Sequence, residues 1–142
     1  MGDIGLNKIQ LTTLKRVPVE GGDVLHALKC SESSFVDFGE AYFSIVEMDV
    51  VKAWKLHHKM TMNFIVPIGN IRFVFVSSDL KERREECIGI SNYVRLTIPP
   101  RVWFGFEGVY SPSSLLLNIA NIEHDPDEVE RIDIAKFKLR FN

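Results

Sequence analysis

The chain of 142 residues carries 17 Lys and Arg against 19 Asp and Glu, which gives a net charge of −2. Its 46% hydrophobic and 25% charged residues are typical of a globular protein and exclude wholesale disorder, and the length suits a single domain over residues 1–142. No apolar run approaches the roughly 18 residues of a membrane helix, and the near-neutral charge argues against general nucleic-acid binding, so neither a membrane nor a nucleic acid is expected as a partner.

The apolar residues fall in short runs rich in β-branched and aromatic members, separated by Gly, Pro, Ser and Asn, a pattern that indicates strands and turns. After an N-terminal arm or strand over 1–20, the predicted strands are 41–47, 50–56, 62–67, 71–76, 93–98 and 115–122. Many short strands with turn signals between them predict an all-β sandwich or barrel.

The segment 64–76 has the pattern of a β-hairpin, because two apolar runs flank the turn sequence Pro-Ile-Gly-Asn. Its second strand is apolar on both faces, with Ile71, Phe73 and Phe75 on one face and Val74 and Val76 beside a charged residue on the other. We therefore expect this strand to be buried between two layers.

Two segments lack the strand pattern. The charged stretch 79–86 has no apolar stripe, and we expect a solvated connection or a single exposed turn there. Helix is expected only as a short turn in the C-terminal part, 125–142, where Asp125 can cap, Pro126 suits the first helical position and Glu128 completes a pattern like a capping box.

The two cysteines, Cys30 and Cys87, lie far apart and follow no pattern, which is typical of free thiols in a reducing cytosol. The N-terminus shows no basic region followed by an apolar stretch, the pattern of a signal peptide. We expect a cytoplasmic protein.

The densest group of polar residues is 52–59, Lys-Ala-Trp-Lys-Leu-His-His-Lys. In an extended strand Lys55 and His57 point the same way, with Ala53 beside them. On the inner face of a barrel, burial and mutual repulsion would lower the pKa of both, so that either could act as a base near neutral pH. The alternative is a basic strand end in solvent that at most steers anions.

A metal site is not expected, because the adjacent His57 and His58 face opposite sides of a strand and no Cys-x-x-Cys or His-x-His spacing occurs. His124 stands at the end of a predicted strand, where it is either functional or a structural hydrogen-bonding residue. The segment 98–106, a proline turn followed by three aromatic residues around one glycine, is consistent with core packing.

Several segments together resemble the dTDP-4-dehydrorhamnose 3,5-epimerase-like branch of the cupin superfamily. They are GDVLH at 22–26, FGEAYFS at 38–44, the segment 51–69, LTIPP at 96–100 with GF at 105–106, and the segment 118–128. The resemblance implies a cupin-type jelly-roll β-barrel, homodimeric, whose interior binds a nucleotide-linked 4-keto-6-deoxy sugar. It implies proton abstraction next to the ketone and reprotonation on the other face, without a cofactor.

The resemblance also assigns roles to residues. Lys55 occupies the position of the family's catalytic His, with His57 two residues later, so the base is one of these two. His124 takes the place of the family's proton donor, and no carboxylate partner of the base is assigned. Three of the four metal-ligand positions of metal-binding cupins hold other residues here, which again predicts no metal.

Four further residues are expected to bind the substrate: Lys52, Asn63 and Arg72 at the diphosphate or the ketone, and Trp103 beside the pocket. Two alternatives to the epimerase are a 3,4-ketoisomerase of the same substrates and a non-catalytic cupin that binds a sugar nucleotide. Loss of the usual catalytic His favours the non-catalytic alternative, whereas a ketoisomerase would be expected to carry a His-x-His arrangement, which Lys55 breaks.

Overall fold

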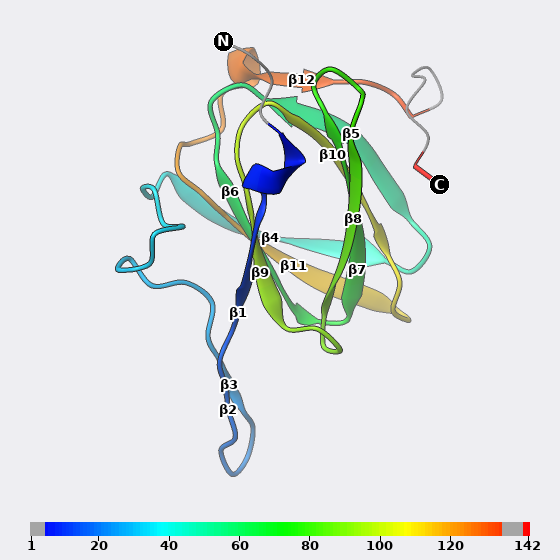
Figure 1. The fold of residues 1–142 in the computed structure, drawn as a ribbon. Helices are drawn as coiled ribbons and strands as arrows, with labels where there is room; N and C mark the ends of the chain where they lie inside the picture. The colour runs from blue at the N-terminus through cyan, green and yellow to red at the C-terminus, as the bar shows by residue number, and fades with distance from the viewer. Residues whose placement is uncertain (1–4, 135–140) are drawn as a thin grey trace.

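A computed structural model describes residues 5–134 and 141–142. Nearly all regular structure is β (Figure 1), and two short 3₁₀ turns, η1 (Leu6–Lys8) and η2 (Pro126–Glu128), accompany twelve strands. The strands are β1 (Gln10–Thr13), β2 (Arg16–Val17), β3 (Val24–Leu25), β4 (Glu40–Glu47), β5 (Val51–His57), β6 (Met62–Ile68), β7 (Asn70–Ser77), β8 (Arg83–Gly89), β9 (Val94–Ile98), β10 (Val102–Gly108), β11 (Ser113–Ala120) and β12 (Val129–Arg131).

The strands form two antiparallel five-stranded sheets that face each other. One sheet has the order β1-β9-β6-β11-β4 and the other the order β12-β5-β10-β7-β8, so that the chain crosses repeatedly from one sheet to the other as in a jelly roll. The inward side chains of both sheets form one core, in which Phe73 is stacked between Phe64 and Phe75. The predicted all-β fold is confirmed, and its core lies between the sheets.

The second sheet is also covered on its outer face. There an outer cluster packs around the indole rings, consisting of Trp54, Leu56, Val74, Val76, Trp103 and Phe141. Because β7 contributes Phe73 and Phe75 to the inner core and Val74 and Val76 to the outer cluster, it is buried on both faces, as its sequence predicts.

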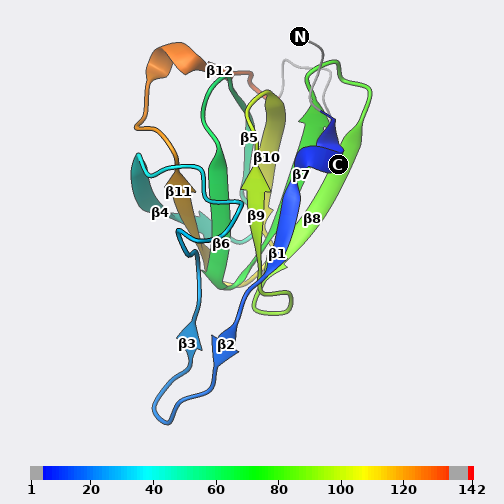
Figure 2. The same cartoon turned by 60° about the vertical axis from the view of Figure 1, so that its left-hand side comes forward.

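The N-terminal part of the chain leaves the barrel and returns to it. β2 and β3 pair only with each other and form a hairpin that projects from one end of the molecule (Figures 1 and 2). The returning segment is held to the outer face of the first sheet by Arg95, which is fully buried. Its guanidinium donates hydrogen bonds to the carbonyl oxygen of Ala27 at 2.7 Å and to the side chains of Glu32 at 2.8 Å and Ser34 at 2.6 Å.

The six predicted strands are confirmed, with ends that differ by a few residues. The hairpin predicted over 64–76 is wrong, because β6 and β7 follow each other through the turn but belong to different sheets and do not pair. The expectation for 79–86 is wrong in part, because Arg83–Gly89 is strand β8, paired with β7 along its whole length. β8 is an edge strand whose outer face meets solvent, so charged side chains are tolerated there, and the lack of an apolar stripe was misleading. Val102–Gly108, expected as aromatic core after a proline turn, is the central strand β10.

The short helical turn is confirmed as η2, where the Asp125 side chain accepts a hydrogen bond from the backbone amide of Asp127 at 2.9 Å. Glu128 does not complete a capping box, because its carboxylate is directed elsewhere, as described below. Of the tail that was expected over 125–142, residues 135–140 lie outside the described part. Within the described residues, no helix has the length and apolar character needed to cross a bilayer.

Candidate active site

A cavity of about 580 Å³ lies between the two sheets, with walls from β4, β5, β6, β10, β11 and β12. Its lining combines apolar side chains, among them Met62, Phe64, Phe104 and Phe106, with polar and charged ones. A cavity whose apolar walls carry converging polar groups is a usual form of a site for a small organic ligand.

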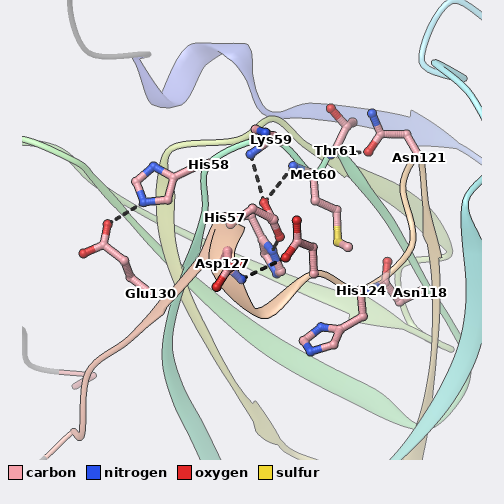
Figure 3. Close-up of polar contacts among 12 residues, drawn as sticks. His57, His58, Lys59, Met60, Thr61, Asn118, Asn121, His124, Asp127 and Glu130 are labelled. Carbon is pink, nitrogen blue, oxygen red and sulfur yellow. Dashed lines mark hydrogen bonds and ion pairs between the residues drawn. The ribbon is translucent and has the colours of Figure 1, made fainter.

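The most tightly held polar group of the lining is His57, at the end of β5. Its Nδ1 lies 2.5 Å from Oε1 of Glu128 at the end of η2, and both side chains are almost completely buried. The other carboxylate oxygen, Oε2, accepts hydrogen bonds from the backbone amides of Lys59 at 2.9 Å and Met60 at 3.2 Å (Figure 3). The carboxylate is therefore fixed by three donors and holds the imidazole in one orientation.

This arrangement decides which nitrogen of His57 can react. An ionised carboxylate only accepts hydrogen bonds, so the Nδ1 atom carries the proton and Nε2 carries a free lone pair. Burial lowers the pKa of His57, and the opposing effect of Glu128 does not outweigh it. For Glu128, burial acts to raise the pKa, but the hydrogen bonds from His57 and the two amides outweigh it and lower the pKa overall. A neutral imidazole beside a carboxylate is suited to act as a general base.

Three cations lie along the same cavity: Lys52 and Lys55 of β5 and Arg131 of β12. Strict alternation along β5 would place Ala53 beside Lys55, but the pairing with β10 shifts register at this point. Lys55 pairs with Phe104 and Lys52 pairs with Phe106, so both lysines lie on the inner face, and Ala53 packs against the outer cluster.

The cations influence one another. Burial lowers the pKa of Lys55, and the positive charges of Arg131 and Lys52 lower it further. The cavity is therefore electropositive although the chain as a whole is slightly acidic, which favours an anionic ligand.

A second polar pair lies on the wall formed by β4 and β11. The Nδ2 atom of Asn118 donates a hydrogen bond to the hydroxyl oxygen of Tyr42 at 3.1 Å, and both side chains line the cavity. The Oδ1 atom of Asn118 is buried and has no hydrogen-bond partner among the described residues. Because a buried polar atom without a partner is costly, it is a candidate contact for a ligand hydroxyl.

Of the residues predicted from the sequence, Lys52, Lys55 and His57 lie together on the cavity, whereas Asn63, Arg72 and Trp103 do not line it. These three alternate along their strands with the core residues Phe64, Phe73 and Phe104, and their side chains therefore point outward. On the outer faces, Asn63 accepts a hydrogen bond from Arg95 and Arg72 forms an ion pair with Glu85. Trp103 packs in the outer cluster.

His124 lies on the exposed loop between β11 and η2, outside the cavity lining, where its backbone amide donates to Oε1 of Glu40 at 3.0 Å. Four residues of the site were not predicted from the sequence: Glu128, Arg131, Tyr42 and Asn118. A signal existed for two of them, since Tyr42 and Asn118 stand at alternating positions of predicted strands inside the segments that resemble the family.

No group of three or more His, Cys, Asp or Glu within 5–134 and 141–142 is arranged to hold a metal ion. The pair of His57 and Glu128 has no third protein ligand in this part of the chain.

The sequence matches no family model and no curated protein. Among solved structures, the chain is similar to a dTDP sugar isomerase from Desulfovibrio desulfuricans G20, with 39% identity over 89% of this chain and 84% of the other, and a TM-score of 0.84.

Two more distant structures share the fold. The sugar 3,4-ketoisomerase QdtA from Thermoanaerobacterium thermosaccharolyticum, in complex with TDP, is 18% identical over 90% of each chain, with a TM-score of 0.76. A dTDP-4-dehydrorhamnose 3,5-epimerase from Sulfolobus tokodaii is 19% identical over 97% of this chain and 85% of that one, with a TM-score of 0.79.

Proposed function

The chain belongs to the dTDP-4-dehydrorhamnose 3,5-epimerase-like family of cupins, and from this membership we propose that it epimerises or isomerises a dTDP-4-keto-6-deoxyhexose. The observation that carries the proposal is the buried pair of His57 and Glu128, which presents a neutral base to an electropositive cavity of about 580 Å³. Removing and returning a proton leaves the oxidation state unchanged, so the reaction needs no redox cofactor.

His57 is the proposed base. Nε2 removes a proton from a carbon next to the ketone, and the positive charge that develops on the imidazole is stabilised by the carboxylate of Glu128. The electron pair moves toward the ketone oxygen, where the positive cavity lowers the energy of the developing charge.

Tyr42 is the proposed proton donor on the other face. Its hydroxyl oxygen accepts from Asn118, which leaves the hydroxyl proton free to point toward the substrate. Tyr42 comes from β4 and His57 from β5, strands of the two facing sheets, so a sugar between them would have one group on each side. His124, the donor proposed from the sequence, is the competing candidate.

Lys52 and Arg131 are proposed to bind the diphosphate, since both lie on the exposed side of the cavity and neither forms an ion pair with a described carboxylate. Two cations facing one diphosphate provide charge-assisted hydrogen bonds.

The test is the exchange of solvent deuterium into dTDP-4-keto-6-deoxyglucose, followed by nuclear magnetic resonance, together with a calorimetric titration with dTDP. We expect exchange by the wild type, loss of exchange with retained dTDP binding in His57→Gln, and unchanged exchange in His58→Gln. His58 is a matched control because it is exposed and pairs with Glu130 at 2.7 Å. Absence of both exchange and millimolar dTDP binding would refute the proposal.

The product of the same reaction separates the two chemistries. An epimerase inverts a ring carbon and keeps the ketone at C4, whereas a 3,4-ketoisomerase moves the ketone to C3. The ketoisomerase is a second candidate because a 3,4-ketoisomerase and a 3,5-epimerase both share this fold. The proposed base, His57, faces the cavity and could serve either reaction. Binding of dTDP without any exchange would identify a non-catalytic sugar-nucleotide-binding cupin.

A homodimer is also proposed. Phe43 and Ile45 are 63% and 66% exposed on the outer face of β4, an edge strand, and the β2–β3 hairpin projects from the same chain with Val24 half exposed (Figure 2). A second copy can cover both features in a two-fold arrangement, because each chain offers an apolar face and a projecting arm.

A cytoplasmic location is proposed on the basis of the two exposed free thiols, Cys30 and Cys87.

A further inference from the structure

Lys55 is a cavity lysine that is partly removed from solvent and has no carboxylate partner among the residues that the structure describes. It is half-buried on the inner face of β5, between Phe104 of β10 and Arg131 of β12 in the sheet. No hydrogen bond or ion pair joins its ammonium group to any residue within the described part of the chain.

The charged groups around Lys55 are mainly positive. Lys52 on the same strand and Arg131 on the neighbouring strand line the same cavity, as does the neutral His57. Asp133, after β12, is the one carboxylate residue among the described cavity-lining residues. Burial and the two cations lower the pKa of Lys55, so a larger fraction of its amine is unprotonated than in a solvated lysine.

A partly desolvated lysine beside other cations is the arrangement that activates an amine toward carbonyl groups. The proposed substrate carries one ketone, and the proposed base, His57, lies two residues along the same face of β5. The two groups that imine catalysis needs, a nucleophilic amine and a general base, are therefore side by side on one strand.

We propose that Lys55 forms a covalent imine with the ketone of the sugar, an inference that rests on the proposed function. The amine nitrogen adds to the carbonyl carbon, and the carbinolamine takes up one proton and loses one water molecule to give a cationic iminium. The neutral amine, the ketone and one proton thus become the iminium and water, with no change of oxidation state.

The iminium acidifies the carbon next to it more strongly than the ketone does. Nε2 of His57 takes the proton, the electron pair of the C–H bond moves into a C=C bond, and the C=N pair moves onto nitrogen to give a neutral enamine. Reprotonation of the carbon, from the other face in an epimerisation, restores the iminium. Addition of water then releases the ketone and the free amine of Lys55 together with the proton.

Trapping with borohydride tests the proposal. Wild-type protein is mixed with dTDP-4-keto-6-deoxyglucose and sodium cyanoborohydride, and the intact mass and the modified peptide are measured. We expect one adduct, with the mass of the substrate less one oxygen atom, attached at Lys55. Lys81→Arg is a control that changes an exposed lysine in the loop between β7 and β8 and still forms the adduct, whereas Lys55→Arg keeps the charge and does not.

A second readout does not depend on trapping. Imine formation exchanges the carbonyl oxygen with water, so the wild type is expected to speed the loss of ¹⁸O from the ketone at least about 100-fold over Lys55→Arg. Deuterium exchange by the wild type with no adduct and no faster ¹⁸O loss would overturn the imine and leave the proposed function intact. An adduct that persists in Lys55→Arg would also overturn it. Failure of the proposed function would be seen separately, as absence of both deuterium exchange and dTDP binding.

Discussion

The Nδ1 atom of His57 lies 2.5 Å from Oε1 of Glu128, although 71 residues separate the two in the chain. The contact depends on β12, which pairs with the end of β5 and brings the last residue of the η2 turn next to His57. A strand of only three residues thus completes the site, because Val129 pairs directly with His57 and Glu128 precedes it.

Glu128→Gln is expected to reduce turnover by about 10³- to 10⁴-fold, the loss typical of a histidine held in the wrong tautomer. The two backbone amides at Oε2 will orient the amide oxygen of Gln toward themselves, which leaves its NH₂ group facing Nδ1 of His57. Nδ1 must then accept, and the proton moves to Nε2, the nitrogen proposed as base. Initial rates of deuterium exchange measure the effect, and a loss of less than about 10-fold would contradict the tautomer argument.

The titration of His57 gives a second prediction. Burial lowers its pKa below the ordinary value of 6.5, so the midpoint followed by imidazole ¹⁵N shifts is expected below that value. Between pH 6.5 and the lower pKa of the folded protein, His57 is protonated in the unfolded chain but neutral in the folded one. The free energy of unfolding therefore falls as the pH falls through this interval. His57→Gln is expected to reduce this slope, and a midpoint at or above 6.5 would show that Glu128 outweighs burial.

The fold could be predicted from the sequence to a large extent because short apolar runs and turn residues report directly on strands. The failures share a cause, since the composition of a strand reflects where it lies in the sheet. β8 is an edge strand and tolerates Arg and Glu, and β12 is too short to show a pattern. Neither can be recognised without knowing its neighbours.

Site residues could be predicted only where residues close in the sequence also lie close together in the cavity lining. Lys55 and His57 share one face of one strand, and alternation is enough to place them together. Lys52 joins them through a register shift that alternation does not predict, and Glu128 and Arg131 arrive from the far end of the chain. Asn63, Arg72 and Trp103 point outward because their neighbours Phe64, Phe73 and Phe104 point inward.

The identity of the proton donor gives a third prediction. Tyr42→Phe removes only the hydroxyl and is expected to lower epimerisation or isomerisation by about 10²-fold or more, the usual contribution of a positioned acid. Deuterium exchange at the carbon that His57 deprotonates should fall less, because the first proton transfer does not use Tyr42. His124→Asn is the comparison variant. A large loss of product in His124→Asn with little effect of Tyr42→Phe would make His124 the donor.

Asn118 gives a fourth prediction, based on its unpartnered Oδ1 atom. Asn118→Leu removes the unpartnered Oδ1 atom together with the hydrogen bond from Nδ2 to Tyr42, and because these two effects oppose each other, the free energy of unfolding is expected to change by less than about 1 kcal/mol. Affinity for the dTDP-sugar is expected to fall about 10-fold, the effect of one lost hydrogen bond. Thermal unfolding with and without ligand measures both quantities. Undiminished affinity would show that Oδ1 does not contact the substrate.

The exposed face of β4 gives the last prediction, which concerns the proposed dimer. Ile45→Lys places a charge in the apolar patch at a position that is 66% exposed in the single chain, so the variant should fold normally but should not associate. Leu80→Lys, the same kind of change at an exposed apolar residue in the loop between β7 and β8, is the matched control. Light scattering during size-exclusion chromatography is expected to give twice the chain mass of 16.2 kDa for the wild type and Leu80→Lys, and 16.2 kDa for Ile45→Lys. A wild type that stays at the single-chain mass, or a variant that still associates, would show that a second copy does not cover this face.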